Sequence, residues 1–137
     1  MKPAIEAAQQ LIVAEFTSKG DWWERYSYLI GLAKTLPPMP AEYKTQDNLI
    51  EGCQNDVWIY GICRNGTMHY WGYSQSVIAS GILVLLLRIL NGRTPDEIKE
   101  SRLTVLDRTG ITSNLSPYLN QGIKRILSRL IELSFLT

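Results

Sequence analysis

The segment that most constrains the fold of this 137-residue chain is "VWIYGICRNGTMHYWG", at positions 57–72. Both of its halves are rich in β-branched and aromatic residues, which favours two strands. Asn65-Gly66 stands between them and predicts a two-residue hairpin turn, because both positions of such a turn require a positive φ. The residues that this turn would place opposite one another are Cys63 with Met68, and Ile62 with His69.

Alternation along the two predicted strands divides their side chains between the two faces of a small antiparallel sheet. One face is expected to carry Ile59, Gly61, Cys63, Met68 and Tyr70, and the other Trp58, Tyr60, Ile62, His69 and Trp71. Both sets are mainly apolar. We therefore expect helices to cover much of this small sheet.

Helical patterns precede the hairpin. Apolar spacing predicts a first helix over 3–19, which Gly20 ends. Asp21 is a suitable N-cap for a second helix, "WWERYSYLIGLAKTL", and the proline-rich "PPMP" at 37–40 terminates it. The polar positions 41–50 predict a loop.

Helical patterns also follow the hairpin. Ser74 is expected to cap a helix over 75–91, whose middle is apolar nearly all round and therefore predicts a central buried helix. "TPDE" at 94–97 is a capping box that begins a short helix. Another short helix is expected around 103–109, and "SP" at 116–117 opens the last helix.

No internal repeat or linker divides residues 1–137, so we expect a single α+β domain with helices packed on a small antiparallel sheet. The formal net charge is +1 and the basic residues are scattered, which argues against a nucleic-acid partner. The longest apolar run, "VIASGILVLLLRIL", includes Arg88 and is shorter than the roughly 20 residues of a membrane span. Glu6 and Gln9 interrupt any secretory signal. We expect a soluble, cytoplasmic protein without a membrane partner.

The chain has two cysteines and one histidine, which are Cys53, Cys63 and His69. A structural zinc site usually takes four ligands arranged as close pairs, whereas these three are widely spaced and a fourth would have to be Glu51 or Asp56. We therefore expect no metal site. A cytoplasmic location argues against a disulfide. His69 is expected to pack beside its strand neighbours, because no triad spacing surrounds it.

The two cysteines lie in different sequence settings. Cys63 ends an apolar strand, where a buried cysteine behaves as a small inert apolar residue. Cys53 follows Gly52 in "EGCQN", and a glycine lets the backbone bend sharply and leaves the sulfur accessible. No cationic residue is adjacent, and Glu51 and Asp56 would raise the pKa of the Cys53 thiol. Cys53 is thus a candidate nucleophile without an obvious base of its own.

"NLIEGCQNDVW" at 48–58 resembles the cysteine-loop motif of the SufE family, whose members accept sulfur from cysteine desulfurases. "WWERYSYLIGLAKTLPPMP", "GILVLLLRILNGRTPDEI" and "LSPYLNQGI" are similar to further segments of that family, in the same order. The resemblance covers almost the whole chain and implies the SufE/IscU-like α+β fold. Tyr73 and Leu119 depart from the family pattern because they stand where an acid and an arginine are usual, and Ser80 stands where a lysine is usual.

The resemblance implies a persulfide carrier. Cys53 matches the acceptor position, and its thiolate would take the outer sulfur from a PLP-dependent, SufS-like desulfurase and pass it to an iron–sulfur scaffold such as SufBCD. The carrier would stimulate the desulfurase, need no cofactor of its own and show no independent turnover. An apolar shelter is expected to protect the sulfur, with Leu49, Ile50 and Trp58 as part of it. Its burial would raise the pKa of the Cys53 thiol, so the loop is expected to open for transfer.

Two other functions stay open at this stage. An IscU-like scaffold would bind a metal or an iron–sulfur cluster, although that type needs three cysteines or an equivalent ligand set and this chain has two. An adaptor would keep the fold and lose the relay through the changes at Tyr73 and Leu119. The aromatic face of the sheet is also compatible with a homodimer.

Overall fold

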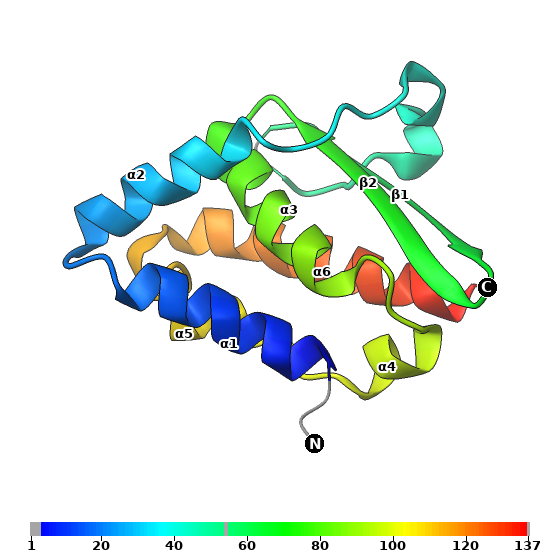
Figure 1. The fold of residues 1–137 in the computed structure, drawn as a ribbon. Coiled ribbons are helices and arrows are strands. Elements are labelled where there is room, and N and C mark those ends of the chain that lie inside the picture. The colour runs from blue at the N-terminus through cyan, green and yellow to red at the C-terminus, as the bar shows by residue number, and fades with distance from the viewer. Residues whose placement is uncertain (1–3, 54, 137) are drawn as a thin grey trace.

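The computed structural model describes residues 4–53 and 55–136 and confirms the α+β class (Figure 1). In this part of the chain the sheet consists of two antiparallel strands, β1 (Val57–Arg64) and β2 (Thr67–Ser74). The helices are α1 (Ala4–Thr17), α2 (Trp22–Ala33), α3 (Val77–Leu90), α4 (Pro95–Glu100), α5 (Val105–Arg108) and α6 (Pro117–Phe135). None of the described helices is both long enough and apolar enough to cross a membrane.

The hairpin has the predicted turn and register. Asn65 and Gly66 have φ values of 52° and 83°, in the left-handed region that most other residues avoid. The observed pairs include Cys63 with Met68 and Ile62 with His69. This pairing confirms the assignment of the side chains to the two faces.

One face of the hairpin and the central helix α3 form much of the core. Ile59, Met68 and Tyr70 are buried on that face, and α3 is buried from Ser80 to Leu90 except at Arg88. Helix α3 packs against α1, α2 and β2, whereas α6 packs against β1 (Figure 1). A helix that is apolar nearly all round is stable where other elements surround it, so the predicted central position of this helix is confirmed.

The second face of the hairpin is covered differently from the prediction. Two 3₁₀ turns, Ala41–Tyr43 and Gln46–Asn48, contact β1 in place of the expected helices. Tyr43 stacks on Tyr60 with ring centroids 3.9 Å apart, and the Lys44 ammonium lies 3.8 Å from the ring centroid of Tyr73. The expected helices therefore cover the first face, whereas a predicted polar loop supplies an aromatic ring and a cation that pack on this face.

Most of the predicted helix caps are confirmed. They are Asp21 for α2, Thr94 with Glu97 as a capping box for α4, and Ser116 for α6. The prediction of Ser74 as the cap of α3 is wrong, because Ser74 is the last residue of β2. Ser76 caps α3 instead, and its Oγ accepts a hydrogen bond from the N–H of Ala79 at 3.2 Å.

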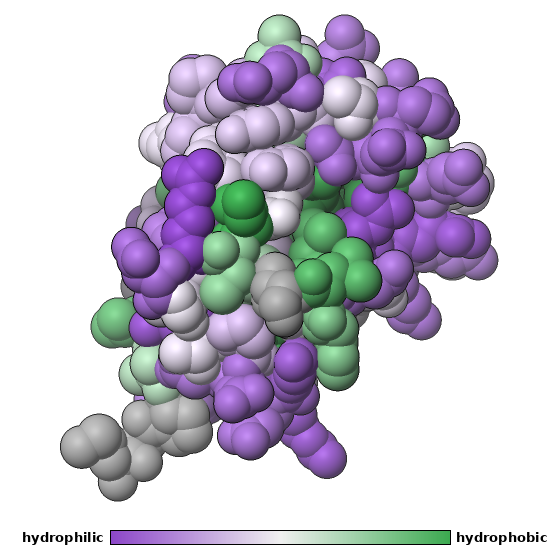
Figure 2. Space-filling model, turned by 90° about the vertical axis from the view of Figure 1, so that its right-hand side faces the viewer, coloured by the Kyte–Doolittle hydropathy of each residue, from purple (hydrophilic) through white to green (hydrophobic). Residues whose placement is uncertain are grey.

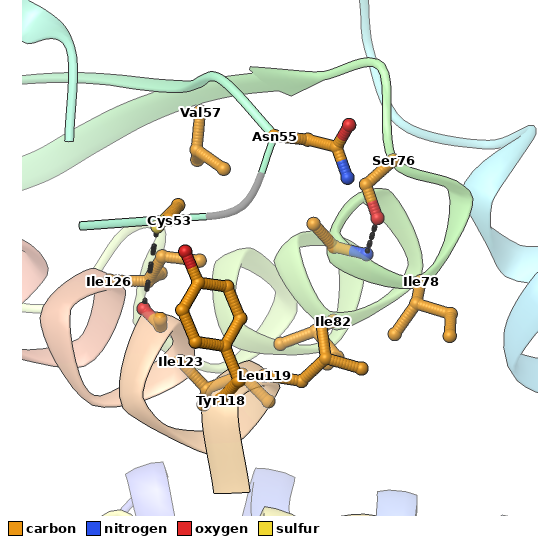
Figure 3. A pocket seen from close by; sticks show the side chains of 12 residues that line it. Cys53, Asn55, Val57, Ser76, Ile78, Ile82, Tyr118, Leu119, Ile123 and Ile126 are labelled. Atoms are coloured by element: carbon orange, nitrogen blue, oxygen red, sulfur yellow. Dashed lines mark hydrogen bonds between the residues drawn. The ribbon is translucent and has the colours of Figure 1, made fainter. Parts of the chain in front are cut away.

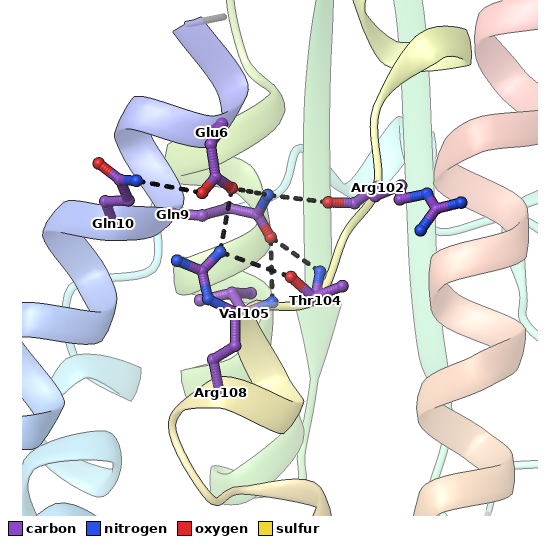
Figure 4. A network of polar contacts seen from close by, with 7 residues as sticks. All are labelled: Glu6, Gln9, Gln10, Arg102, Thr104, Val105 and Arg108. Atoms are coloured by element: carbon purple, nitrogen blue, oxygen red, sulfur yellow. Dashed lines mark hydrogen bonds and ion pairs between the residues drawn. The ribbon is translucent and has the colours of Figure 1, made fainter. Parts of the chain in front are cut away.

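Gln9 ties α1 to the segment that precedes α5, an attachment that its sequence setting did not indicate (Figure 4). The Gln9 residue is 1% exposed, and its Nε2 donates to the carbonyl of Arg102 at 2.9 Å. Its Oε1 accepts from the backbone N–H groups of Thr104 and Val105 at 2.9 and 3.0 Å. The buried amide thus provides hydrogen-bond partners for backbone groups at the start of α5.

Candidate functional site

Cys53 lies in a loop whose two ends are joined by a backbone hydrogen bond. The N–H of Ile50 donates to the carbonyl of Val57 at 2.8 Å. Gly52 has a φ of 84°, a left-handed value that favours glycine, so the predicted sharp bend before Cys53 is confirmed. The bend turns the thiol toward α6 (Figure 3).

The Cys53 thiol is half-buried beside a small pocket (Figure 3). Its Sγ lies 3.7 Å from the carbonyl oxygen of Gly122, where the S–H donates a weak hydrogen bond. The pocket has a cavity volume of about 40 Å³. On that measure a single water needs about 10–15 Å³, so there is room for one added sulfur atom beside Sγ.

Apolar side chains of α3 and α6 form most of the pocket wall. They are Ile78, Ala79 and Ile82 from α3, and Leu119, Ile123 and Ile126 from α6. Tyr118 also lines the pocket, is 54% exposed, and stands beside Cys53 in the close-up view (Figure 3). An apolar wall of this kind favours a neutral sulfur over a charged one.

The predicted apolar shelter exists, but the residues expected to form part of it do not. Leu49, Ile50 and Trp58 do not line the pocket around Cys53. Ile50 is buried in the core, and Leu49 forms an isolated antiparallel bridge with Trp58. The loop turns its thiol toward α3 and α6, so most of the shelter comes from distant segments, while Asn55 and Val57 line the pocket from the chain that follows Cys53.

Burial raises the pKa of the Cys53 thiol, and the positive charge of Arg125 lowers the pKa in opposition. The expected effect of burial is therefore found, whereas Glu51 and Asp56, which were also expected to raise this pKa, do not contribute to the shift and are both exposed. Desolvation dominates because the apolar wall replaces water around the sulfur. In the resting arrangement the thiol is therefore held mainly in its protonated form.

Gly122 and Arg125 belong to this site but were not recognised as site residues from the sequence. A Cβ added at Gly122 would make a van der Waals contact with the Cys53 Sγ at 3.4 Å, so the thiol packs directly against this position of α6. The spacing of three residues puts Gly122 and Arg125 on one face of the helix. That spacing could be read from the sequence, but the sequence did not show that this face of α6 contacts the Cys53 loop.

Cys63 and His69 lie at the other end of the hairpin from Cys53. Cys63 is near the far end of β1, a strand whose eight residues span about 25 Å. Cys63 was predicted to be buried, and it is half-buried and packs against the core. Both cysteines are free thiols. Within residues 4–53 and 55–136, no group of three or more His, Cys, Asp or Glu side chains could hold a metal ion.

The hairpin turn and the C-terminal end of α6 lie on the side of the molecule that faces the viewer in Figure 2. Apolar residues gather on this face among hydrophilic ones. Phe135 and Leu136, at the end of α6, are 60% and 75% exposed. This apolar surface lies at the opposite end of the hairpin from Cys53 and is separate from its pocket.

The three departures from the family pattern have different surroundings. Leu119 lines the Cys53 pocket and extends its apolar wall. Tyr73 lies on the aromatic face, with its ring centroid 5.9 Å from that of Trp58. The Ser80 hydroxyl is buried and donates to the carbonyl of Ser74 at 3.0 Å, which fastens α3 to the end of β2. Leu119 is thus the departure that bears directly on the thiol.

Known proteins match this chain over most of its length. The model of the SufE family, described as an Fe–S metabolism associated domain, matches residues 10–134. The sulfur acceptor protein CsdE of Escherichia coli K12 is 36% identical over 118 residues, which cover 85% of this chain and 80% of that protein. The cysteine desulfuration protein SufE of Wigglesworthia glossinidia brevipalpis is 33% identical over 121 residues, which cover 83% of this chain and 81% of that protein.

The fold also has a counterpart among solved structures. The solution structure of a hypothetical protein from Thermus thermophilus is similar with a TM-score of 0.76 at 18% identity, covering 97% of this chain and 94% of that one. This likeness concerns the fold alone. The family match includes the Cys53 loop and the two helices that line its pocket. The resemblance seen in the sequence is therefore confirmed, and the chain belongs to the SufE family.

Proposed function

We propose that this chain accepts a persulfide sulfur on Cys53 from a SufS-like cysteine desulfurase and passes it to a SufBCD-like iron–sulfur scaffold. The relatives named above are a sulfur acceptor and a cysteine desulfuration protein, which supports the class of reaction. The observation that carries the proposal is a single thiol in a bent loop, set against an apolar pocket with room for one more sulfur atom.

The expected reaction belongs to the same class as thiol–disulfide exchange. The Cys53 thiolate attacks the outer sulfur of a persulfide on the desulfurase. A new S–S bond forms to Cys53 while the S–S bond of the donor breaks, and the donor cysteine leaves as a thiolate. The outer sulfur keeps its oxidation state, so the transfer needs no oxidant or reductant. Delivery to the scaffold repeats this exchange with Cys53 as the donor.

The resting geometry implies that the loop moves during transfer. Attack requires a thiolate, whereas burial raises the pKa of Cys53 and its Sγ faces the carbonyl of Gly122. We expect the docked desulfurase to draw the loop away from α6 and to provide the surroundings that deprotonate the thiol. Faster hydrogen exchange over residues 48–56 on adding a desulfurase would support this opening, and unchanged exchange there would count against it.

The alternative of an IscU-like metal scaffold has less support. The hairpin puts Cys63 and His69 about one strand length away from Cys53, so these three residues do not converge on one ion. The cofactor of the reaction, PLP, would belong to the desulfurase. The homodimer and the cytoplasmic location stay predictions.

The test is mass spectrometry after incubation with a desulfurase, PLP and cysteine. We expect a gain of one sulfur mass on Cys53, which is lost in Cys53→Ser and kept in Cys63→Ser. The two cysteine variants are matched, since each removes one half-buried thiol. Sulfur on Cys63 alone would overturn the assignment of the acceptor. A chain that gains no sulfur at all, while still binding the desulfurase, would be the adaptor without relay activity.

A further inference from the structure

Two glycines lie where the Cys53 loop and α6 meet. A Cβ added at Gly122 of α6 would contact the Cys53 Sγ at 3.4 Å, an ordinary van der Waals distance. Gly52 of the loop leaves space for Arg125, since a Cβ added there would lie 2.3 Å from Nε and 2.7 Å from Cζ of the guanidinium. Real atoms do not approach so closely, so a side chain at Gly52 and Arg125 in this position exclude each other. The guanidinium thus rests on the backbone next to Cys53.

The elements around Cys53, which are α3, α6 and its own loop, differ in the charged groups that they bring near the thiol. The lining residues of α3 and its cap, such as Ile82 and Ser76, carry no charge, and α6 adds the hydroxyl of Tyr118 to the pocket. The carboxylates of the loop itself, Glu51 and Asp56, are exposed. Among the described residues, Arg125 is the charged group that affects the thiol, and it lowers the pKa of Cys53 against the larger effect of burial.

We propose that Arg125 is a positioning residue for sulfur acceptance, whose guanidinium, seated on Gly52, favours the anionic forms of Cys53. These forms are the thiolate of Cys53 and the persulfide anion that replaces it, each while the loop rests against α6. An apolar wall favours neutral sulfur and so reduces the fraction of Cys53 that is ionised. A cation beside the loop acts in the opposite direction and increases that fraction. The inference rests on the proposed function for its biological role and names a second residue of the same site.

The test is the pH dependence of Cys53 alkylation by iodoacetamide. It is measured in a Cys63→Ser background, so that Cys53 is the one cysteine that can be alkylated. Arg125→Gln should move the profile to higher pH and slow alkylation at pH 7 by roughly two- to fivefold, the range that exposed charge interactions support. The difference should vanish at a pH where both thiols are ionised. Arg125→Lys keeps the charge and should lie close to the parent profile.

Lys124→Gln is the matched control, because it removes the same charge from the adjacent, exposed position of α6. It should leave the profile unchanged. An unchanged profile in Arg125→Gln, or a shift equal to that of Lys124→Gln, overturns the proposal. A shift to lower pH overturns it as well, because it would mean that Arg125 only pins the loop and that its loss exposes the thiol to water.

The alkylation measurement uses the protein without a desulfurase, so the two proposals can fail separately. If the parent chain takes up no sulfur from a desulfurase, the relay fails whatever Arg125→Gln does to the alkylation profile. If the parent chain takes up sulfur and Arg125→Gln keeps the parent alkylation profile, the role of Arg125 fails alone. Where both hold, sulfur loading at pH 7 should fall in Arg125→Gln by about the same factor as alkylation.

Discussion

Replacing Gly122 by alanine should have two distinct effects, one on the free energy of unfolding and one on the space available to an added sulfur at Cys53. Gly122 is buried within α6, and a Cβ added there would lie 3.4 Å from Sγ, 3.8 Å from Cα and 3.9 Å from Cβ of Cys53. These are van der Waals distances, with the first one close to the limit. Gly122→Ala should therefore fold with the loop still in place against α6.

The two expected effects of this substitution have opposite signs. Alanine is favoured over glycine in a helix interior by about 0.8–1 kcal/mol, so the free energy of unfolding should rise by up to that amount. The same methyl group takes part of a cavity of about 40 Å³. Overfilling a packed site costs about 1–3 kcal/mol, which would lower persulfide occupancy at Cys53 by roughly 5-fold to 150-fold. The variant should be more stable and a poorer acceptor.

Gly31→Ala is the matched control. Gly31 lies in α2, is exposed, and has nothing within 4 Å of an added Cβ. It should gain a similar stability and load sulfur normally. Urea denaturation would give the free energies of unfolding, and mass spectrometry after incubation with a desulfurase and cysteine would give the fraction of Cys53 that carries sulfur.

The predicted loss of sulfur occupancy is refuted if Gly122→Ala is as stable as expected and carries sulfur to the same extent as the parent chain. That result would mean that the outer sulfur does not use the space beside Gly122. A variant that loses stability while Gly31→Ala gains it would instead contradict the assumption that the 3.4 Å contact with Sγ is tolerated.

Two further predictions concern pH and the core. Because burial raises the pKa of Cys53, the neutral thiol adds stability that is fully present below the unfolded pKa of about 8.5 and is lost as pH rises through the higher folded pKa. The free energy of unfolding, measured by urea under reducing conditions, should thus fall less steeply above pH 8.5 in Cys53→Ser, and equal slopes would contradict this coupling. Gln9→Leu should lower the free energy of unfolding by about 1–3 kcal/mol, because buried backbone groups of Arg102, Thr104 and Val105 lose their partner. Gln10→Leu, at the half-buried neighbour, should lower the free energy of unfolding by less. An equal loss in the two variants would contradict the role given to the Gln9 amide.

Local signals predicted the fold well where they depend on few residues. The Asn65-Gly66 turn leaves no freedom in the pairing of its strands, so the register could be derived from the turn alone. The junction between β2 and α3 was predicted incorrectly, because Ser74 and Ser76 are equivalent caps by residue type. The extent of pairing between the strands decided between them, since Ser74 pairs with Val57 and so belongs to β2.

The candidate site also has features that the sequence could predict and features that it could not. The bend at Gly52 and the motif around Cys53 are contiguous in the sequence, so both could be recognised there. The residues expected to shelter Cys53 were chosen because they are its neighbours along the chain, and the actual wall comes from α3 and α6. The cation at Arg125 was missed for the same reason.

By itself, the sequence determined the hairpin, the helices and a thiol in a sharply bent loop, because turn chemistry, caps and apolar periodicity act over a few residues. Only the tertiary structure decided what surrounds that thiol. Which face of α6 meets the loop depends on how α3, α6 and β1 pack together, and packing joins residues that no local pattern connects.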